Sequence, residues 1–128
     1  MAKEKEKRVE PRVPLRLKVA IVYHNHADAA TRPTYHGLTH DVSLSGLSAI
    51  VEYNVFTEDE VTVLLALPPA NVGGQQKIVE ASAKMVHTSY SSSHDAFRIG
   101  MQFTKFKKPG KTLLEEAIER RSLKFHYA

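Results

Sequence analysis

Apolar and polar side chains alternate with a period of two along most of this chain, a pattern typical of strands that are buried on one face. The clearest stretch is residues 15–24, and Pro11 and Pro14 just before it disfavour a helix there. Residues 25–33 lack periodicity and end in a proline, which predicts a hairpin loop. The predicted strands cover residues 15–24, 34–42, 47–53, 61–67, 77–87 and 97–103.

The period changes only near the end of the chain. Apolar residues there recur every three to four positions from Leu113 onward, and Thr112 with Glu115 has the spacing of a capping box. This pattern predicts a short C-terminal helix that packs Leu114 and Ile118 onto the sheet. Strands separated by turns, with no helical pattern between them, predict an antiparallel barrel or sandwich and argue against a parallel α/β sheet.

Length and composition limit the possible classes of protein. The 128 residues suffice for a single core, and the absence of cysteine excludes disulfides and thiolate metal sites. The chain has no apolar run of about 18 residues and its N-terminus lacks the apolar stretch of a secretory signal, so we expect no membrane segment and a cytoplasmic protein. A net charge of +4 favours anionic partners such as nucleotides, nucleic acid or acidic membrane surfaces.

Two arginines and a downstream turn form the most informative motif. Arg8 and Arg12 stand four residues apart, next to a charged stretch in which lysine and glutamate alternate over residues 3–7. We expect this N-terminal arm to be solvated and to fray without a ligand. Farther along, Asp41-Val42-Ser43-Leu44-Ser45-Gly46 combines a carboxylate, a hydroxyl and a glycine in the turn after the second predicted strand.

These residue types suit a receptor for a guanine nucleotide. Arginine presents a fixed fork of donors that can bind a phosphate or the O6 and N7 edge of guanine, and its plane can stack on a purine. Asp41 can accept hydrogen bonds from N1 and N2 of guanine, which adenine does not offer in that arrangement. Ser43 can bond to the same base or to a phosphate, and Gly46 lets the backbone turn sharply and the ligand approach.

With these motifs the sequence resembles the PilZ domain family of bacterial cyclic di-GMP receptors, over about residues 7–106. The Arg-x-x-x-Arg motif lies in residues 7–14 and the Asp-x-Ser-x-x-Gly motif in residues 41–47. A third match, Ile99-Gly100-Met101-Gln102-Phe103, has the pattern of a late Gly-x-x-Phe strand. The order of the three motifs makes the resemblance more specific than any one of them.

The resemblance implies an all-β fold, a six-stranded antiparallel β-barrel of the split-barrel type with a short C-terminal α-helix. It divides the chain into a flexible arm (1–10), the barrel (11–108) and the C-terminal helix and tail (109–128). The implied protein is a non-catalytic receptor without a cofactor, and its arm orders over cyclic di-GMP to signal to an unidentified effector protein. Adaptors of this family influence motility, attachment or exopolysaccharide production.

By position, the resemblance also implies roles for single residues. Arg8 and Arg12 would hold guanine and phosphate, Asp41 and Ser43 would bind guanine, and Gly46 would shape the turn. These five residues constitute the predicted ligand site.

Three further cations have open roles. Arg12 and Arg16 also have the four-residue spacing, but we favour Arg8 and Arg12 because Arg16 is predicted to lie inside the first strand. Lys7 occupies a position where many relatives carry arginine, and this position bears on whether one ligand or a stacked pair binds, so the stoichiometry stays open. Arg98 lies on the polar side of the sixth predicted strand and faces either solvent or ligand.

A metal site and a hydrolase are not predicted. His24 and His26 would point to one side of a strand, but the sequence places no third ligand beside them. His40, Asp41 and Ser43 are hydrolytic residue types, but residues 40 and 41 should point to opposite faces of an extended strand. The chain also lacks a Gly-x-Ser-x-Gly elbow.

Two rival functions use the same barrel. A basic barrel can bind single-stranded nucleic acid, but such proteins usually expose aromatic side chains on a sheet face, whereas Phe97 and Phe103 fall on the inward alternation. Nucleic acid is therefore not expected as a partner. The second rival is a PilZ barrel that serves as a protein-interaction module without a ligand, and the intact motif residues argue against it.

Overall fold

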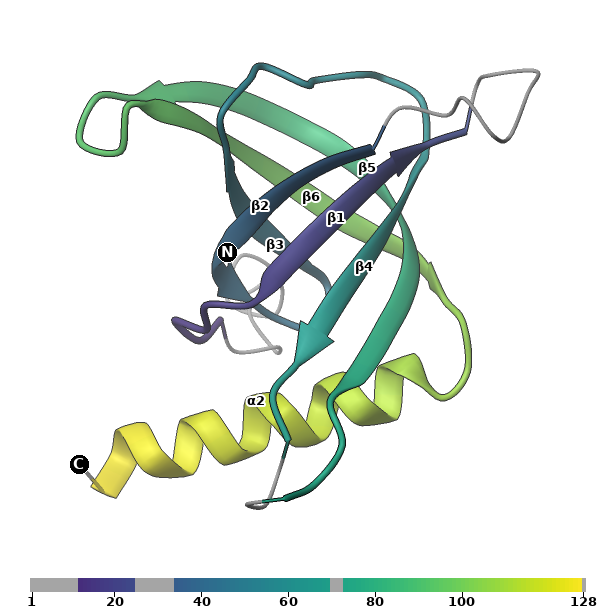
Figure 1. The fold of residues 1–128 in the computed structure, drawn as a ribbon, viewed down its shortest axis with the longest axis vertical. Helices are drawn as coiled ribbons and strands as arrows, with labels where there is room; N and C mark the ends of the chain where they lie inside the picture. Colours follow the sequence, from purple (N-terminus) through teal and green to yellow (C-terminus); the bar gives the residue numbers. More distant parts are fainter. Residues whose placement is uncertain (1–11, 25–33, 70–72, 128) are drawn as a thin grey trace, which may run out of the picture.

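The computed structural model describes residues 12–24, 34–69 and 73–127, and for residues 122–127 it describes the backbone alone. Antiparallel strands form a closed barrel in the order β1-β2-β3-β6-β5-β4, which confirms the predicted fold (Figure 1). The strands are β1 (Lys18–Tyr23), β2 (Thr34–Val42), β3 (Gly46–Val51), β4 (Val61–Leu67), β5 (Lys77–Ser91) and β6 (Ala96–Phe106).

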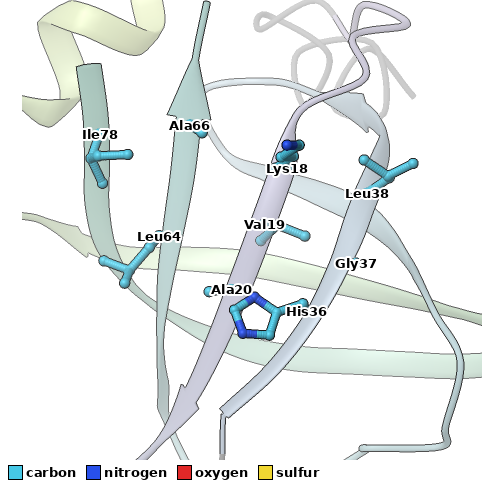
Figure 2. A pocket seen from close by; sticks show the side chains of 9 residues that line it. All are labelled: Lys18, Val19, Ala20, His36, Gly37, Leu38, Leu64, Ala66 and Ile78. Carbon is cyan, nitrogen blue, oxygen red and sulfur yellow. The ribbon is translucent and has the colours of Figure 1, made fainter. Parts of the chain in front are cut away.

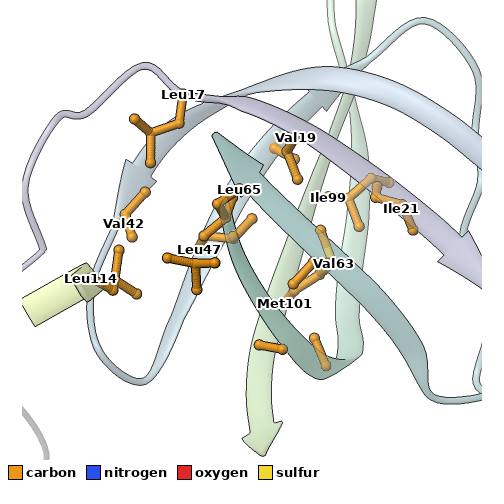
Figure 3. Close-up of a cluster of buried hydrophobic side chains, with 14 of the residues drawn as sticks. Leu17, Val19, Ile21, Val42, Leu47, Val63, Leu65, Ile99, Met101 and Leu114 are labelled. Carbon is orange, nitrogen blue, oxygen red and sulfur yellow. The ribbon is translucent and has the colours of Figure 1, made fainter. Parts of the chain in front are cut away.

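Strand β4 illustrates how the alternating pattern produces the barrel wall. Every second residue from Val61 to Leu67 is buried, and the residues between them are only partly covered. The barrel interior is filled by aliphatic side chains of this kind, as Figure 3 shows for Val19, Leu47 and Ile99. Complete burial of one such side chain contributes about 1.5–3 kcal/mol, so the core is the main source of stability.

Helix α2 (Gly110–Tyr127) lies across one end of the barrel (Figure 1). Its Leu114 is fully buried and joins the same core as the strands (Figure 3). The helix begins two residues before Thr112, so the predicted capping box is wrong. The amide of Leu113 bonds to the carbonyl of Pro109 at 3.1 Å, which starts the helical bonding earlier. Within the described residues, no helix combines the length and the apolar composition that crossing a membrane requires.

Strand β1 is shorter than predicted, and Arg16 precedes it instead of lying inside it. The reason is a buried side chain on β2 that replaces part of the backbone ladder. The hydroxyl of Thr39 accepts a hydrogen bond from the amide of Leu17 at 2.8 Å and donates one to the carbonyl of Leu15. These bonds, with a backbone bond of 2.8 Å from the amide of Thr39 to the carbonyl of Leu17, hold the chain extended beside β2 ahead of the strand.

Strands β5 and β6 are longer than predicted, and the turn between them is confined to residues 92–95. Ser89 and Ser91, which follow the predicted end of this strand, lie in β5. Tyr90 and Phe97 pair across the two strands, with ring centroids 5.5 Å apart in an edge-to-face arrangement. This aromatic pair supports the strands beyond the end of the core. The C-terminal end of β3, in contrast, comes earlier than predicted: the strand ends at Val51 instead of residue 53.

Candidate ligand-binding site

A β-bulge in β2 gathers charged side chains on the outer surface of the barrel. The register with β3 shifts between Thr39 and Asp41. The carboxylate of Asp41 accepts hydrogen bonds from the guanidinium of Arg12 at 2.7 Å and that of Arg98 at 3.4 Å. Nδ1 of His40 lies 3.4 Å from the same carboxylate. The expectation that residues 40 and 41 point to opposite faces is therefore wrong, because the bulge interrupts the alternation.

Arg12 is held at this cluster by the segment that leads into β1. Val13 pairs with Val42 at the end of β2 through two backbone hydrogen bonds of 3.0 Å each. On the other side, Nε of Arg121 in α2 donates to the carbonyl of Pro14 at 2.9 Å. The base of the predicted arm is thus fastened to both the barrel and the helix, and Arg12 is directed toward Asp41.

The cluster carries more positive than negative charge. Two guanidinium groups face a single carboxylate, and the side chain of Asp41 is only 18% exposed while those of Arg12 and Arg98 are 49% and 39% exposed. The contact at 2.7 Å is a close charge-assisted hydrogen bond, whereas the contact at 3.4 Å is weak. Free guanidinium donors therefore remain on both arginines, and the site suits an anionic ligand.

The turn between β2 and β3 is built around a buried serine. The side chain of Ser43 is inaccessible to solvent, and its hydroxyl accepts from the amides of Ser45 at 3.1 Å and Gly46 at 3.3 Å. Gly46 is the first residue of β3, and a Cβ atom there would lie 2.1 Å from the carbonyl oxygen of Met101. The glycine is thus required by the close approach of β6, whereas the sequence had suggested a sharp turn.

Strand register connects Asp41 with His87 through two buried residues. Asp41 pairs in register with Ser48, Ser48 with Gly100, and Gly100 with His87. The imidazole of His87 covers Gly100, since its nearest ring atom is 2.3 Å from the position that a Cβ would take. No motif in the sequence pointed to His87; only the register opposite a glycine identifies it.

The family model for the PilZ domain matches residues 6–120, which is most of the chain. The chain belongs to the PilZ domain family. This PilZ domain shares its fold with the Bacillus subtilis inhibitor of motility (MotI/DgrA), with a TM-score of 0.72 and 14% identity over 92% of this chain and 52% of that chain. It therefore spans about half the length of the B. subtilis protein.

A second structure with this fold is the PilZ domain of YcgR from Escherichia coli with c-di-GMP. The TM-score is 0.63 and the identity 13%, over 94% of this chain and 95% of that chain. Among curated proteins, a search found no match. At these identities the two solved structures establish the shared PilZ fold.

The structure of this PilZ domain brings some of the predicted ligand residues together at Asp41, and it leaves the roles of other predicted residues untested. Lys7 and Arg8 lie outside the described residues, so their roles stay predictions. Arg16 is exposed and makes no ion pair with any described residue. Arg98, which the sequence left between solvent and ligand, reaches Asp41.

The histidines do not assemble a metal site within the described part of the chain, where no three metal-binding side chains cluster. Nε2 of His24 bonds to the hydroxyl of Thr62, and His26 lies outside the described residues. The hydroxyl of Ser43 bonds inside its turn and not to His40, so the two do not form a nucleophile and base pair in this PilZ domain.

Proposed function

We propose that this PilZ domain is a non-catalytic receptor for cyclic di-GMP, which regulates motility, attachment or exopolysaccharide production through a protein partner. The observation that carries the proposal is the cluster of Arg12, Asp41 and Arg98, which joins the two sequence motifs at the base of the arm. The family match supports the ligand class, as does the presence of c-di-GMP in the structure of the YcgR PilZ domain.

The cluster can exchange its internal contacts for contacts with the ligand. Arg12 and Arg98 would donate to phosphate oxygens or to O6 and N7 of guanine, and Asp41 would accept from N1 and N2 of guanine. Partly exposed ion pairs such as these contribute only about 0–1 kcal/mol. Replacing them by contacts with the ligand therefore costs little, and the pre-positioned side chains limit the entropy lost on binding.

The turn and the arm have different roles in this proposal. Because Ser43 is buried and bonded within the turn, we assign its hydroxyl and Gly46 to shaping the turn. Arg8 would supply the second guanidinium of the arm, four residues before Arg12, and Lys7 would bear on the number of ligands. Ordering of the arm over the ligand would be the signal that a partner reads.

Isothermal titration tests the proposal. The chain would be titrated with cyclic di-GMP, cyclic di-AMP, GTP and a short single-stranded oligonucleotide. We expect selective, saturable binding of cyclic di-GMP, and a loss of about ten- to a hundredfold, on the order of 1–3 kcal/mol, in Arg12→Ala. Arg120→Ala removes an exposed arginine of α2 and serves as the matched control, with no expected loss. The titration also reports one or two ligands per chain.

Other outcomes would contradict specific parts of the proposal. An absence of binding would indicate a ligand-free interaction module, and binding of the oligonucleotide alone would indicate a nucleic-acid barrel. If Arg12→Ala unfolds the chain by circular dichroism, the arginine is structural. If Arg16→Ala loses affinity while Arg8→Ala does not, the ligand pair is Arg12 and Arg16.

A further inference from the structure

A groove of about 560 Å³ crosses the outer surface of the barrel where β2, β1, β4 and β5 lie side by side (Figure 2). Leu38 forms one side, and Leu64 and Ile78 form the other, with Lys18 and Ala20 of β1 between them (Figure 2). The groove is separate from the core because these residues point outward.

The lining is unusually apolar for an outward face. Strand register places Lys18 beside Leu38 on one side and Ala66 on the other, and Ala66 beside Ile78. Leu38 is 42% exposed and Ile78 is 54% exposed. Ala66 lies between Lys18 and Ile78, and its small side chain leaves the hollow. Exposed apolar side chains on both sides of a hollow, with a lysine between them, indicate a surface that a partner covers.

The charge of the groove specifies the partner further. Lys18 forms no ion pair with any described residue. The acidic residue beside Leu64 in the register is Glu80, and Nζ of Lys107 lies 3.7 Å from its carboxylate. The ammonium of Lys18 therefore has no neutralising neighbour among these residues and favours a carboxylate on the partner.

The barrel also restricts the form of the partner. Because β2, β1, β4 and β5 pair with one another along the groove, a partner seated there has no free strand edge to pair with. Polyproline segments favour grooves lined by aromatic rings, and no Phe, Tyr or Trp lines this one. Four strands about 4.8 Å apart span about 14 Å, which accommodates a helix about 10–12 Å wide.

We propose that this groove binds an acidic amphipathic helix of a protein partner. Apolar residues spaced three and four apart on that helix would contact Leu38, Leu64 and Ile78, and an aspartate or glutamate would pair with Lys18. The described part of α2 does not offer such a face to a second copy of the chain, because its Leu114 is buried in its own barrel.

The groove lies close to the candidate ligand site on the same strand. Leu38 precedes Asp41 by three residues on β2, and Lys18 follows Leu17, which is bonded to Thr39. The base of the arm is therefore connected to Lys18 through Leu17. The expectation that a protein partner exists rests on the proposed function, whereas the shape and charge of the groove support the inference separately.

A library of helix-forming peptides displayed on phage tests the inference, with the full chain as bait. Binders selected on the original chain would then be measured against Ala20→Arg, which fills the groove. We expect peptides with apolar residues at spacings of three and four and a carboxylate on the same face. Their affinity should fall at least tenfold in Lys18→Glu and recover when the peptide carboxylate is replaced by lysine. Lys84→Glu, an exposed site on β5 outside the groove, should leave affinity unchanged.

Three results would overturn the inference. Selected peptides that bind Ala20→Arg as tightly as the original chain would occupy another surface. Peptides that are basic would contradict the charge argument. Sedimentation that shows self-association of the original chain, abolished by Ala20→Arg, would assign the groove to a second copy. Titration of Ala20→Arg with cyclic di-GMP separates the two proposals. A chain that binds cyclic di-GMP but no helical peptide would contradict the groove alone, and a chain that binds peptide but no cyclic di-GMP would contradict the proposed function alone.

Discussion

Replacing the buried Thr39 by valine tests how the base of the arm is held. The side chain has no exposed surface, and valine has nearly the same shape, so the change removes the hydroxyl with little effect on packing. Two backbone groups lose their partners, the amide of Leu17 and the carbonyl of Leu15. A buried polar group without a partner costs about 1–3 kcal/mol. Because Leu15 is only partly buried and can recruit water, we expect a total destabilisation of about 2–4 kcal/mol.

Urea unfolding followed by circular dichroism measures this change. With a slope of about 1.5 kcal/mol per molar urea, the midpoint should fall by about 1–3 M at an unchanged slope. Thr39→Ser keeps the hydroxyl and removes one methyl group, so it should cost only about 1 kcal/mol. The reasoning is refuted if Thr39→Val is as stable as the original chain, or more stable than Thr39→Ser. The valine variant should also bind cyclic di-GMP more weakly, because Arg12 loses part of its support.

Three other changes give separate predictions. Asp41→Ala should weaken binding of cyclic di-GMP more than of cyclic di-AMP in titrations, and equal losses would remove its role in base selectivity. Gly46→Ala should lower stability by about 1–3 kcal/mol in urea, because its Cβ meets the Met101 carbonyl; an unchanged midpoint would contradict this close approach. Burial, and secondarily Tyr35, raises the pKa of Tyr23 to about 12 from 10.0. The stability that Tyr23 contributes through this shift is complete below pH 10.0 and is lost as the pH rises to about 12. The melting temperature of Tyr23→Phe should therefore fall less over this pH range than that of the original chain. Equal falls in the two proteins would argue against the shift.

Much of the fold was predictable because alternation directly reflects burial. In β4 each residue predicted to face inward is buried, and the strand ends where two prolines follow Leu67. The start of β1 was not predictable in this way. Leu17 keeps the alternation and is buried, but the side chain of Thr39 occupies its amide instead of a strand partner. Side-chain bonds over 22 residues of separation leave no local signal in the sequence.

The candidate site was predictable in its residue types and less so in its geometry. The motifs identified Arg12 and Asp41, and the polar position of Arg98 made it a candidate. The contact of His40 with Asp41 depends on the bulge in β2, which no glycine or proline marks in the sequence. The buried position of Ser43 depends on its bonds within the turn, since a serine in a turn is equally compatible with exposure.

The hydrogen bond between Arg121 and the carbonyl of Pro14 has a consequence for protein engineering. It places the point where the chain enters the barrel next to the point where it leaves along α2, since the two atoms are 2.9 Å apart. Domains whose entry and exit points are adjacent tolerate insertion into a loop of another protein. Residues 12–121, which keep Arg12 and the pairing of Val13 with Val42, therefore have the geometry of a portable unit. Such a unit could be grafted into a host enzyme or a fluorescent protein without separating the host's flanking segments.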